Sequence, residues 1–418
     1  MREMKDSGIE WIGKIPHCWN TSKLKYLGQY INGYAFKPEE WGSKGVPIIR
    51  IQDLTGSNDN PNYFEGQIDK KYWVENGDIL ISWAATLDAF IWNKGNGWLN
   101  QHIFKAVPNR RIINYDFFFW MIKESMKNMN NDNKHGIFMQ HVTLSVFNNF
   151  TIPMPPLAEQ ERIAAFLDAE CAEIDAVLEK TRASIEEYRK LKQAVITQAV
   201  TKGIRGDRPM KDSGIEWIGD IPAEWDVVRI KNLFDYRNER NFKPLEEVNL
   251  ISLYTDKGVV QHCDLDETTG NKASNADGYK LVYENDIVVN IILCWMGAIG
   301  RSAYFGVTSP AYDVYSPKQK TNSKFYHYLF RTNGFSGDCY KVGRGIMAMR
   351  WRTYSDQFRA IKVVSPPQSE QEEIVEYLDE KCEGIDDLIA KKQQYLTQIE
   401  NYKKSLIYEY VTGKKEVV

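Results

Sequence analysis

The strongest constraint on the fold of this chain is an internal repeat. Residues 4–16 return at 210–222 with one difference, Lys14 in the first copy and Asp220 in the second. A second shared segment reads Pro-Pro-x-x-Glu-Gln-Glu, at 155–161 and again at 366–372. A period of roughly 210 residues is far longer than the repeat of a solenoid. The chain therefore consists of two similar halves, like a two-fold dimer joined into one polypeptide.

Each Pro-Pro segment opens a long stretch with the pattern of an amphipathic helix. From 159 to 202, and again in the second copy, apolar residues recur at steps of three and four. A long helix with one apolar stripe needs a partner. The chain must run along the first helix into the second half and return along the second helix, so we expect an antiparallel coiled coil. A stalk that only dimerises separate chains stays open as an alternative.

The remaining residues form two globular regions with mixed patterns. Short apolar runs at 46–51, 78–82, 250–254 and 286–289 are typical of strands, and 115–127 and 323–331 of helices. The expected fold class is α+β, with two mixed α/β domains separated by the antiparallel helices and a pseudo-two-fold internal repeat. The predicted segments are 1–16 and 17–153, the central helical region 154–222 with the second repeat copy, 223–365, and the C-terminal helical region 366–418.

The distribution of charge is more informative than the net charge of −3. Residues 17–153 hold 14 Lys and Arg against 12 Asp and Glu, and residues 223–365 hold 19 against 16. The globular regions are thus mildly basic and the helical regions acidic. A local surface that faces phosphates remains compatible with this composition.

Motifs that the sequence lacks limit the cellular compartment and the chemistry that we expect for this protein. The apolar runs are too short to span a bilayer, and the six cysteines form no C-x-x-C pair, so we expect a cytoplasmic protein without membrane contact. No phosphate-binding glycine loop is present, and the six histidines have no metal-ligand spacing. We therefore expect a binding protein that is not an enzyme.

The doubled motifs resemble a known family over the whole chain. The repeated block followed by Trp19 or Trp225, together with the Pro-Pro-x-x-Glu-Gln-Glu helix starts, is similar to the specificity subunit of type I restriction–modification systems. The resemblance implies target-recognition domains at 17–153 and 223–365. Each would read one half of a bipartite asymmetric DNA site, and the helices would set the unread spacer.

The same resemblance implies the partners of the chain. They are double-stranded DNA, two methyltransferase (modification) subunits and endonuclease/translocase (restriction) subunits. No cofactor is expected in this chain, because S-adenosylmethionine, ATP and Mg belong to the partner subunits. The open alternative is a non-catalytic scaffold whose two domains bind proteins, with the helices as a stalk.

Candidate DNA contacts are polar or basic residues in segments that the sequence predicts as loops. A cluster between 341 and 352 is the richest in arginine, glycine and tryptophan, although a solvated loop charge is the competing interpretation for each residue. Trp83 and Trp295 are candidates for stacking on bases or for core packing. The first-domain candidates are Arg50, Gln52, Lys134, His135, Gln140 and His141, and the second-domain candidates are Tyr254, Lys257, Lys341, Arg344, Arg350, Trp351 and Arg352.

Overall fold

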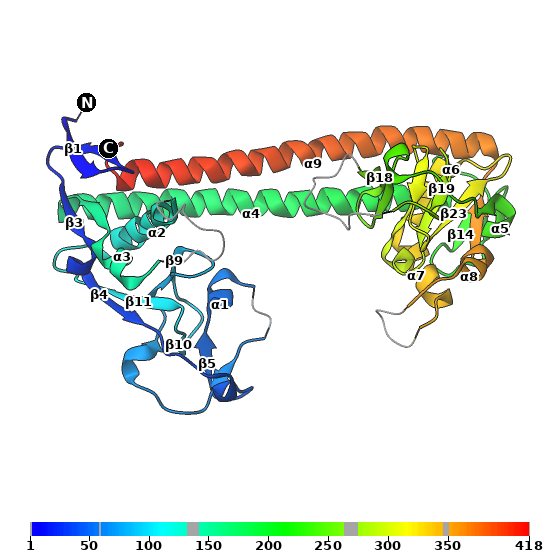
Figure 1. Cartoon of the computed structure of the whole chain (residues 1–418). Coiled ribbons are helices and arrows are strands. Elements are labelled where there is room, and N and C mark those ends of the chain that lie inside the picture. The colour runs from blue at the N-terminus through cyan, green and yellow to red at the C-terminus, as the bar shows by residue number, and fades with distance from the viewer. Residues whose placement is uncertain (1, 58–59, 132–141, 263–274, 346–350, 418) are drawn as a thin grey trace. The chain divides into compact units, whose positions relative to one another are not determined.

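The computed structural model describes residues 2–57, 60–131, 142–262, 275–345 and 351–417. It divides into two compact units, Met1–Arg182 with Gln394–Val418, and Ala183–Gln393. Each unit combines one globular region with part of each long helix, α4 (Leu157–Lys202) and α9 (Gln368–Val411) (Figure 1). These units cut across the five segments expected from the sequence, whose boundaries stay a prediction.

Unit 1 starts with an antiparallel hairpin that is the first copy of the repeated block, β1 (Met4–Ile9) and β2 (Gly13–Pro16). Its main sheet is antiparallel, in the order β4 (Gly28–Asn32), β11 (Ile103–Pro108), β8 (Ile79–Ser82), β9 (Asp88–Ile91). A second sheet has the order β6 (Tyr63–Phe64), β5 (Val46–Ile49), β10 (Gly97–Leu99), β7 (Trp73–Val74), with β5 and β10 parallel. The remaining elements are β3 (Asn20–Lys23) paired with β12 (Thr151–Met154), α1 (Ile51–Thr55), α2 (Tyr115–Asn131) and α3 (Leu144–Asn149).

Unit 2 repeats this plan, beginning with the hairpin β13 (Met210–Asp212) and β14 (Asp220–Pro222). Its main sheet is antiparallel, in the order β16 (Phe234–Arg237), β23 (Tyr312–Pro317), β20 (Ile287–Asn290), β21 (Ile299–Arg301). Two further antiparallel pairs are β17 (Ile251–Tyr254) with β18 (Gly258–Gln261), and β19 (Lys280–Val282) with β22 (Gly306–Thr308). The remaining elements are β15 (Asp226–Arg229) paired with β24 (Lys362–Ser365), α5 (Ile230–Leu233), α6 (Ser323–Phe330), α7 (Asn333–Val342) and α8 (Ser355–Ala360).

The two units match strand by strand. The main sheets have the same order, with β4, β11, β8 and β9 corresponding to β16, β23, β20 and β21. The parallel contact of β5 with β10 returns as a parallel bridge between Leu250 and Val307. The prediction of two mixed α/β domains built on one internal repeat is therefore confirmed.

The repeated block is part of the hydrophobic core of each unit. In unit 1, Ile15 and Trp19 are fully buried in one cluster with α2, the start of α4 and the end of α9. In unit 2, Ile221 and Trp225 occupy the same positions in the corresponding cluster. The near-identity of the two blocks thus follows from a shared packing role.

Within each unit the two long helices pair antiparallel. In unit 1, Asp175 of α4 pairs with Lys403 of α9 at 2.6 Å, and Arg182 pairs with Glu400 at 2.8 Å. In unit 2, Lys192 pairs with Asp386 at 2.6 Å. Exposed ion pairs of this kind stabilise by about 0–1 kcal/mol each. Apolar residues of both helices, among them Leu167 and Leu378, are fully buried in the cores of the two units. No helix of the described residues is long and apolar enough to cross a membrane.

The end of each long helix contacts the repeated block of its unit. In unit 1, Lys414 Nζ, just beyond α9, donates to the backbone oxygen of Ile12 at 2.8 Å. In unit 2, Lys202 Nζ donates to the oxygen of Ile218 at 2.8 Å. Unit 2 makes this contact within one continuous segment, whereas unit 1 makes it between the two ends of the chain (Figure 1).

Candidate nucleic-acid interface

Arg50 lies where β5 ends and α1 begins. Its backbone N–H donates to Asp53 Oδ2 at 2.8 Å, which fixes the first turn of the helix. Its guanidinium carbon lies 4.8 Å from the ring centre of Trp41, which is 40% exposed. The neighbouring Gln52 is exposed. A guanidinium held on an exposed ring keeps its N–H groups available for a phosphate or a base edge.

Tyr254 and Lys257 lie at the corresponding place in unit 2. β17 matches β5, and the chain then turns through 255–257 into β18 instead of entering a helix. Lys257 is exposed, with Nζ 6.0 Å from the ring centre of the half-buried Tyr254. The two units thus present different basic groups from equivalent strands.

The described residues on either side of 346–350 are joined by backbone and ring contacts. Arg344 and Arg352 form a two-residue ladder, because each backbone N–H donates to the oxygen of the other at 2.8 and 3.0 Å. The Trp351 ring stacks on Tyr340, with ring centres 5.0 Å apart. A Cβ at Gly343 would lie 2.3 Å from Trp351 Nε1, so only glycine leaves room for this ring. The ladder holds the backbones of Arg344 and Arg352 side by side.

The remaining candidates have partners within unit 1 or unit 2, or lie outside the described residues. Lys341 is exposed but pairs with Glu216 of the second repeated block at 3.0 Å. The half-buried Trp83 stacks on Phe104, and the half-buried Trp295 donates its Nε1 to the Ile292 oxygen at 2.9 Å, so both pack on the cores. Lys134, His135, Gln140, His141 and Arg350 lie outside the described residues. The DNA-binding role of every candidate stays a prediction.

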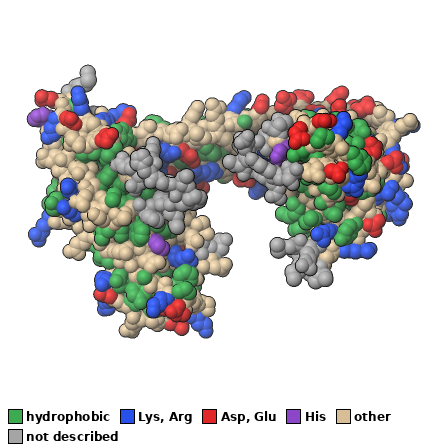
Figure 2. All heavy atoms as spheres, viewed as in Figure 1, with side chains coloured by type: hydrophobic (Ala, Val, Ile, Leu, Met, Phe, Trp, Pro, Cys, Tyr) green, Lys and Arg blue, Asp and Glu red, His purple; other side chains and the backbone are tan. Residues whose placement is uncertain are grey.

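The visible face of the molecule mixes the two signs of charge. In Figure 2, Lys and Arg side chains on each globular region are interspersed with Asp and Glu. On that face the slight excess of positive charge therefore forms no continuous patch. Contacts with DNA would depend on individual loops more than on a broad electrostatic surface.

A buried Trp–Glu–Arg cluster, which sequence reasoning missed, joins the two repeated motifs in each unit. In unit 1, Trp19 Nε1 donates to Glu159 Oε2 at 2.9 Å, and Arg2 pairs with Oε1 at 2.6 Å. In unit 2, Trp225 Nε1 donates to Glu370 Oε2 at 2.9 Å, and Arg208 pairs with Oε1 at 2.6 Å. The signal was present in the sequence, since Arg2 and Arg208 share the spacing of the blocks although they lie outside them.

The glutamine of the same motif connects each long helix to its globular region. Gln160 Oε1 accepts from the backbone N–H of Asn114 at 2.7 Å, directly before α2. Gln371 Oε1 accepts from Asn322 at 2.8 Å, directly before α6. Each glutamine thus fixes the start of the globular helix against the start of the long helix.

Comparison with known proteins agrees with this architecture. A family model described as the type I restriction modification DNA specificity domain matches residues 16–187 and again 222–398. The specificity subunit of the type I restriction enzyme EcoBI from Escherichia coli is 26% identical over 315 residues, which cover 72% of this chain and 65% of that protein. The chain therefore spans just under two thirds of that relative's own length. The MjaVIII specificity subunit of Methanocaldococcus jannaschii is 26% identical over 423 residues, which cover 97% and 94% of the two chains.

A solved structure has the same fold. It comes from work on complex assembly and conformational transition of the type I R-M system, and has a TM-score of 0.70 with 14% identity. The alignment covers 96% of this chain and 99% of the other. At this identity the likeness establishes the fold alone.

Proposed function

Because the chain belongs to the type I restriction-modification DNA specificity family, we propose that its two units recognise one bipartite asymmetric DNA sequence, one half-site each. The observation that carries this proposal is that the two units share one scaffold but differ in the loops that the scaffold carries. Both units have the same sheet order and the same Trp–Glu–Arg cluster. Equivalent strands lead into different structures, because β5 is followed by the helix start at Arg50 in unit 1 and β17 by a turn in unit 2. Different side chains on one scaffold suit two different half-sites.

In this proposal the paired helices α4 and α9 set the spacer between the half-sites. The antiparallel contacts within each unit support a stiff connection, since a helix paired along an apolar stripe bends little. A fixed separation matters because two half-sites must present their grooves on compatible sides of the duplex.

The chain would act as a non-catalytic cytoplasmic subunit that assembles with the other subunits of the system. Two equivalent frames, one around each repeated block, would dock two copies of a methyltransferase subunit, and endonuclease/translocase subunits would join them. S-adenosylmethionine, ATP and Mg would be bound by those partners. Among the described residues, no group of three or more His, Cys, Asp or Glu side chains is arranged to hold a metal ion.

The direct test is to map methylated adenines in the genome of the host. The proposal expects one motif with two defined halves and a constant gap. A double variant, Arg344→Ala with Arg352→Ala, should lose or relax one half only, because the ladder belongs to one unit. Arg229→Ala is the matched control, since this exposed arginine lies in the same unit on β15.

Two results would contradict the proposal. Methylation that is unchanged when the whole chain is deleted would exclude a specificity role. Equal relaxation of both halves in the ladder variant would refute the assignment of one half-site to each unit. A gel shift with mixed duplexes and the co-purified partner distinguishes the two function classes. A DNA-binding subunit should shift a duplex, whereas a protein-binding scaffold should shift none.

A further inference from the structure

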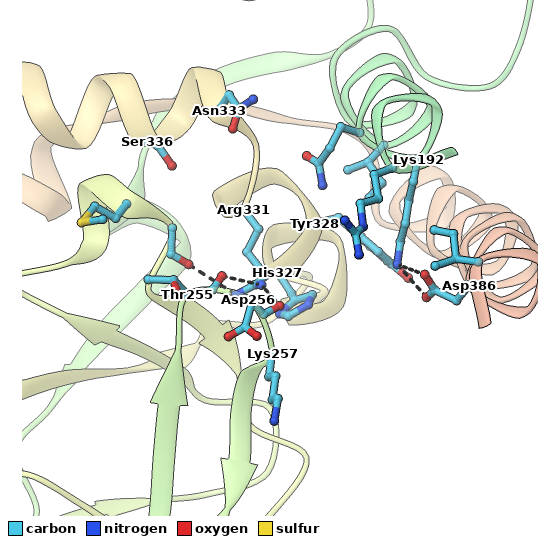
Figure 3. A pocket seen from close by; sticks show the side chains of 16 residues that line it. Lys192, Thr255, Asp256, Lys257, His327, Tyr328, Arg331, Asn333, Ser336 and Asp386 are labelled. Carbon is cyan, nitrogen blue, oxygen red and sulfur yellow. Dashed lines mark hydrogen bonds and ion pairs between the residues drawn. The ribbon is translucent and has the colours of Figure 1, made fainter. Parts of the chain in front are cut away.

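Unit 2 contains an open cavity between its parts of α4 and α9 and its globular region. Its volume is about 600 Å³. Figure 3 shows Lys192 on α4 and Asp386 on α9 at one side, with His327, Tyr328 and Arg331 of the α6 region between them and the strands. The turn that carries Lys257 lies on the other side of the cavity, next to the strands. Four cationic side chains line the cavity, against two carboxylates: Arg189, Lys192, Lys257 and Arg331, against Asp256 and Asp386.

Two of these cations are held by partners on other elements of unit 2. Arg331 donates to four backbone oxygens, those of Gly297, Ile299, Thr255 and Asp256, at 2.8 to 3.3 Å. Lys192 pairs with Asp386 at 2.6 Å. Within the described residues, Arg189 has an ion pair with Glu186, one turn earlier on the same exposed helix face, and the exposed Lys257 lies with Nζ 6.0 Å from the ring centre of Tyr254. Arg189 and Lys257 are therefore the cations that can turn toward a ligand.

His327 adds a neutral donor to the cavity lining. Its Nδ1 accepts from the backbone N–H of Arg301 at 3.1 Å, which leaves the ring proton on Nε2. Burial, together with the positive charges of Arg331, Arg301 and Lys324, lowers the pKa of His327 to about 3. The ring thus stays neutral near pH 7 and keeps an N–H group.

Comparison with unit 1 shows which contacts around the cavity recur and which cavity residues are replaced. The frame is shared: the pair Lys192–Asp386 returns as Lys403–Asp175. Tyr328 donates to Asp379 as Trp120 donates to Asp168. The position of Arg189 is taken by Glu400 in unit 1, and that of His327 by Phe119. Architecture alone therefore does not require the arginine and the histidine.

We propose that this cavity binds a phosphate group, with Arg189 and Lys257 as its cationic contacts and the phosphodiester backbone of the bound duplex as its source. The chemistry suits a phosphate because exposed cations and neutral N–H or O–H donors, among them Ser336, line the same cavity. This inference rests on the proposed DNA recognition. It adds that α4 itself contributes a backbone contact beside the second recognition domain.

The experiment compares the salt dependence of duplex binding for the full chain and its variants, each with the co-purified partner. Each lost phosphate contact should reduce the slope of log affinity against log salt by about 0.9. The double variant Arg189→Gln with Lys257→Gln should lose up to about 1.8 of that slope, without a change in the preferred sequence. The matched control is Lys180→Gln with Lys190→Gln, which removes two exposed charges of α4 outside the cavity. Arg189→Glu, which copies Glu400 of unit 1, should weaken binding more than Arg189→Gln alone.

A second arm distinguishes the sources of phosphate. Inorganic pyrophosphate is titrated into the same proteins by calorimetry. Loss of slope in the cavity variant alone supports the duplex backbone as the source. An unchanged slope with loss of pyrophosphate binding supports a phosphate site for a free nucleotide. If both measurements match those of the control variant, the phosphate site is refuted. If the unaltered chain binds no duplex even with its co-purified partner, the proposed function fails, and the pyrophosphate arm alone decides the cavity.

Discussion

Glu159 and Glu370 each hold a buried carboxylate between an indole N–H and a guanidinium. A buried carboxylate that loses a hydrogen-bond donor is still desolvated but is no longer fully paired. Removal of the donor should therefore lower the free energy of unfolding. Trp19→Phe and Trp225→Phe should each lower the free energy of unfolding by roughly 1.5–3 kcal/mol, before any cavity cost. Urea unfolding measures the change. Trp73→Phe is the control, since Trp73 donates to Glu75 at the surface, and an equal loss there would contradict the argument.

The same cluster predicts a pH dependence. Burial alone would raise the pKa of Glu159, but the hydrogen bonds from Arg2 and Trp19 and the charge of Arg2 hold it below its ordinary value of 4.5. A carboxyl whose pKa is lowered by folding stabilises the protein above its unfolded pKa, and this contribution is lost as the pH falls through the folded value. Glu159→Gln should therefore be destabilised at neutral pH, and its deficit should shrink in acid. Unfolding midpoints across the acid range test this, with the exposed Glu161→Gln as the control.

At the residue scale, the identity of a side chain and of its neighbours in the sequence does not determine how deeply the side chain is buried. The tripeptide Phe-Lys-Pro occurs at 36–38 and 242–244, with the same spacing as the repeated block. Phe36 is buried at 6% exposure, whereas Phe242 is 82% exposed. Identical local sequence thus leads to opposite burial, because the surrounding loops differ. Loop surroundings also decide which basic side chains are free, so the paired state of Lys341 could not be predicted.

At the element scale, packing outweighs charge in the pairing of the long helices. Leu378 is fully buried in the core of unit 2, and Leu378→Ala should lower the free energy of unfolding by about 2–5 kcal/mol through lost burial and a cavity. Lys192→Ala removes the exposed ion pair with Asp386 and should cost about 0–1 kcal/mol. Thermal or urea unfolding of both variants checks the order. A larger loss for Lys192→Ala would show that charge dominates.

Elements with a clear hydrophobic period were predictable, and their ends were not. The helices α2 and α6 and the strands β8 and β20 lie where periodicity placed them. The run 46–51 was expected to be extended throughout, but the strand ends at Ile49 and α1 starts at Ile51. The cause is local, because the Asp53 carboxylate accepts from the backbone N–H of Arg50 and starts a helical turn. A single side-chain hydrogen bond of this kind is invisible to periodicity.

At the scale of the whole molecule, the repeat separates shared from specific parts. The block, the Trp–Glu–Arg cluster and the motif glutamines recur with matched hydrogen-bond distances in both units. The recognition loops do not recur, and of the cavity lining Arg189 and His327 are replaced by Glu400 and Phe119 in unit 1. Long-range pairing was inferable from the sequence because the helices repeat, whereas the loops carry no period. The residue types of the candidate contacts could therefore be predicted, but their positions in the folded loops could not.

The separation of the half-sites gives the last prediction. Four residues inserted near Tyr188 in α4, with a matching insertion near Ile399 in α9, add one turn to each helix, or roughly 6 Å. An insertion of four residues changes the phase of the apolar stripe only slightly, so the pairing should survive. At about 3.4 Å per base pair the preferred spacer should lengthen by at most about two base pairs, with both half-sites unchanged.

Mapping methylated adenines for this variant measures the spacer and both half-sites together. Insertion in α4 alone is the control, because it shifts one apolar stripe against the other and should weaken the pairing instead of lengthening the gap. Since the recognition loops are untouched, any change in the half-site sequences would mean that the helices do more than set distance. An unaltered spacer in a folded, active variant would show that the separation of the half-sites does not depend on the length of α4 and α9.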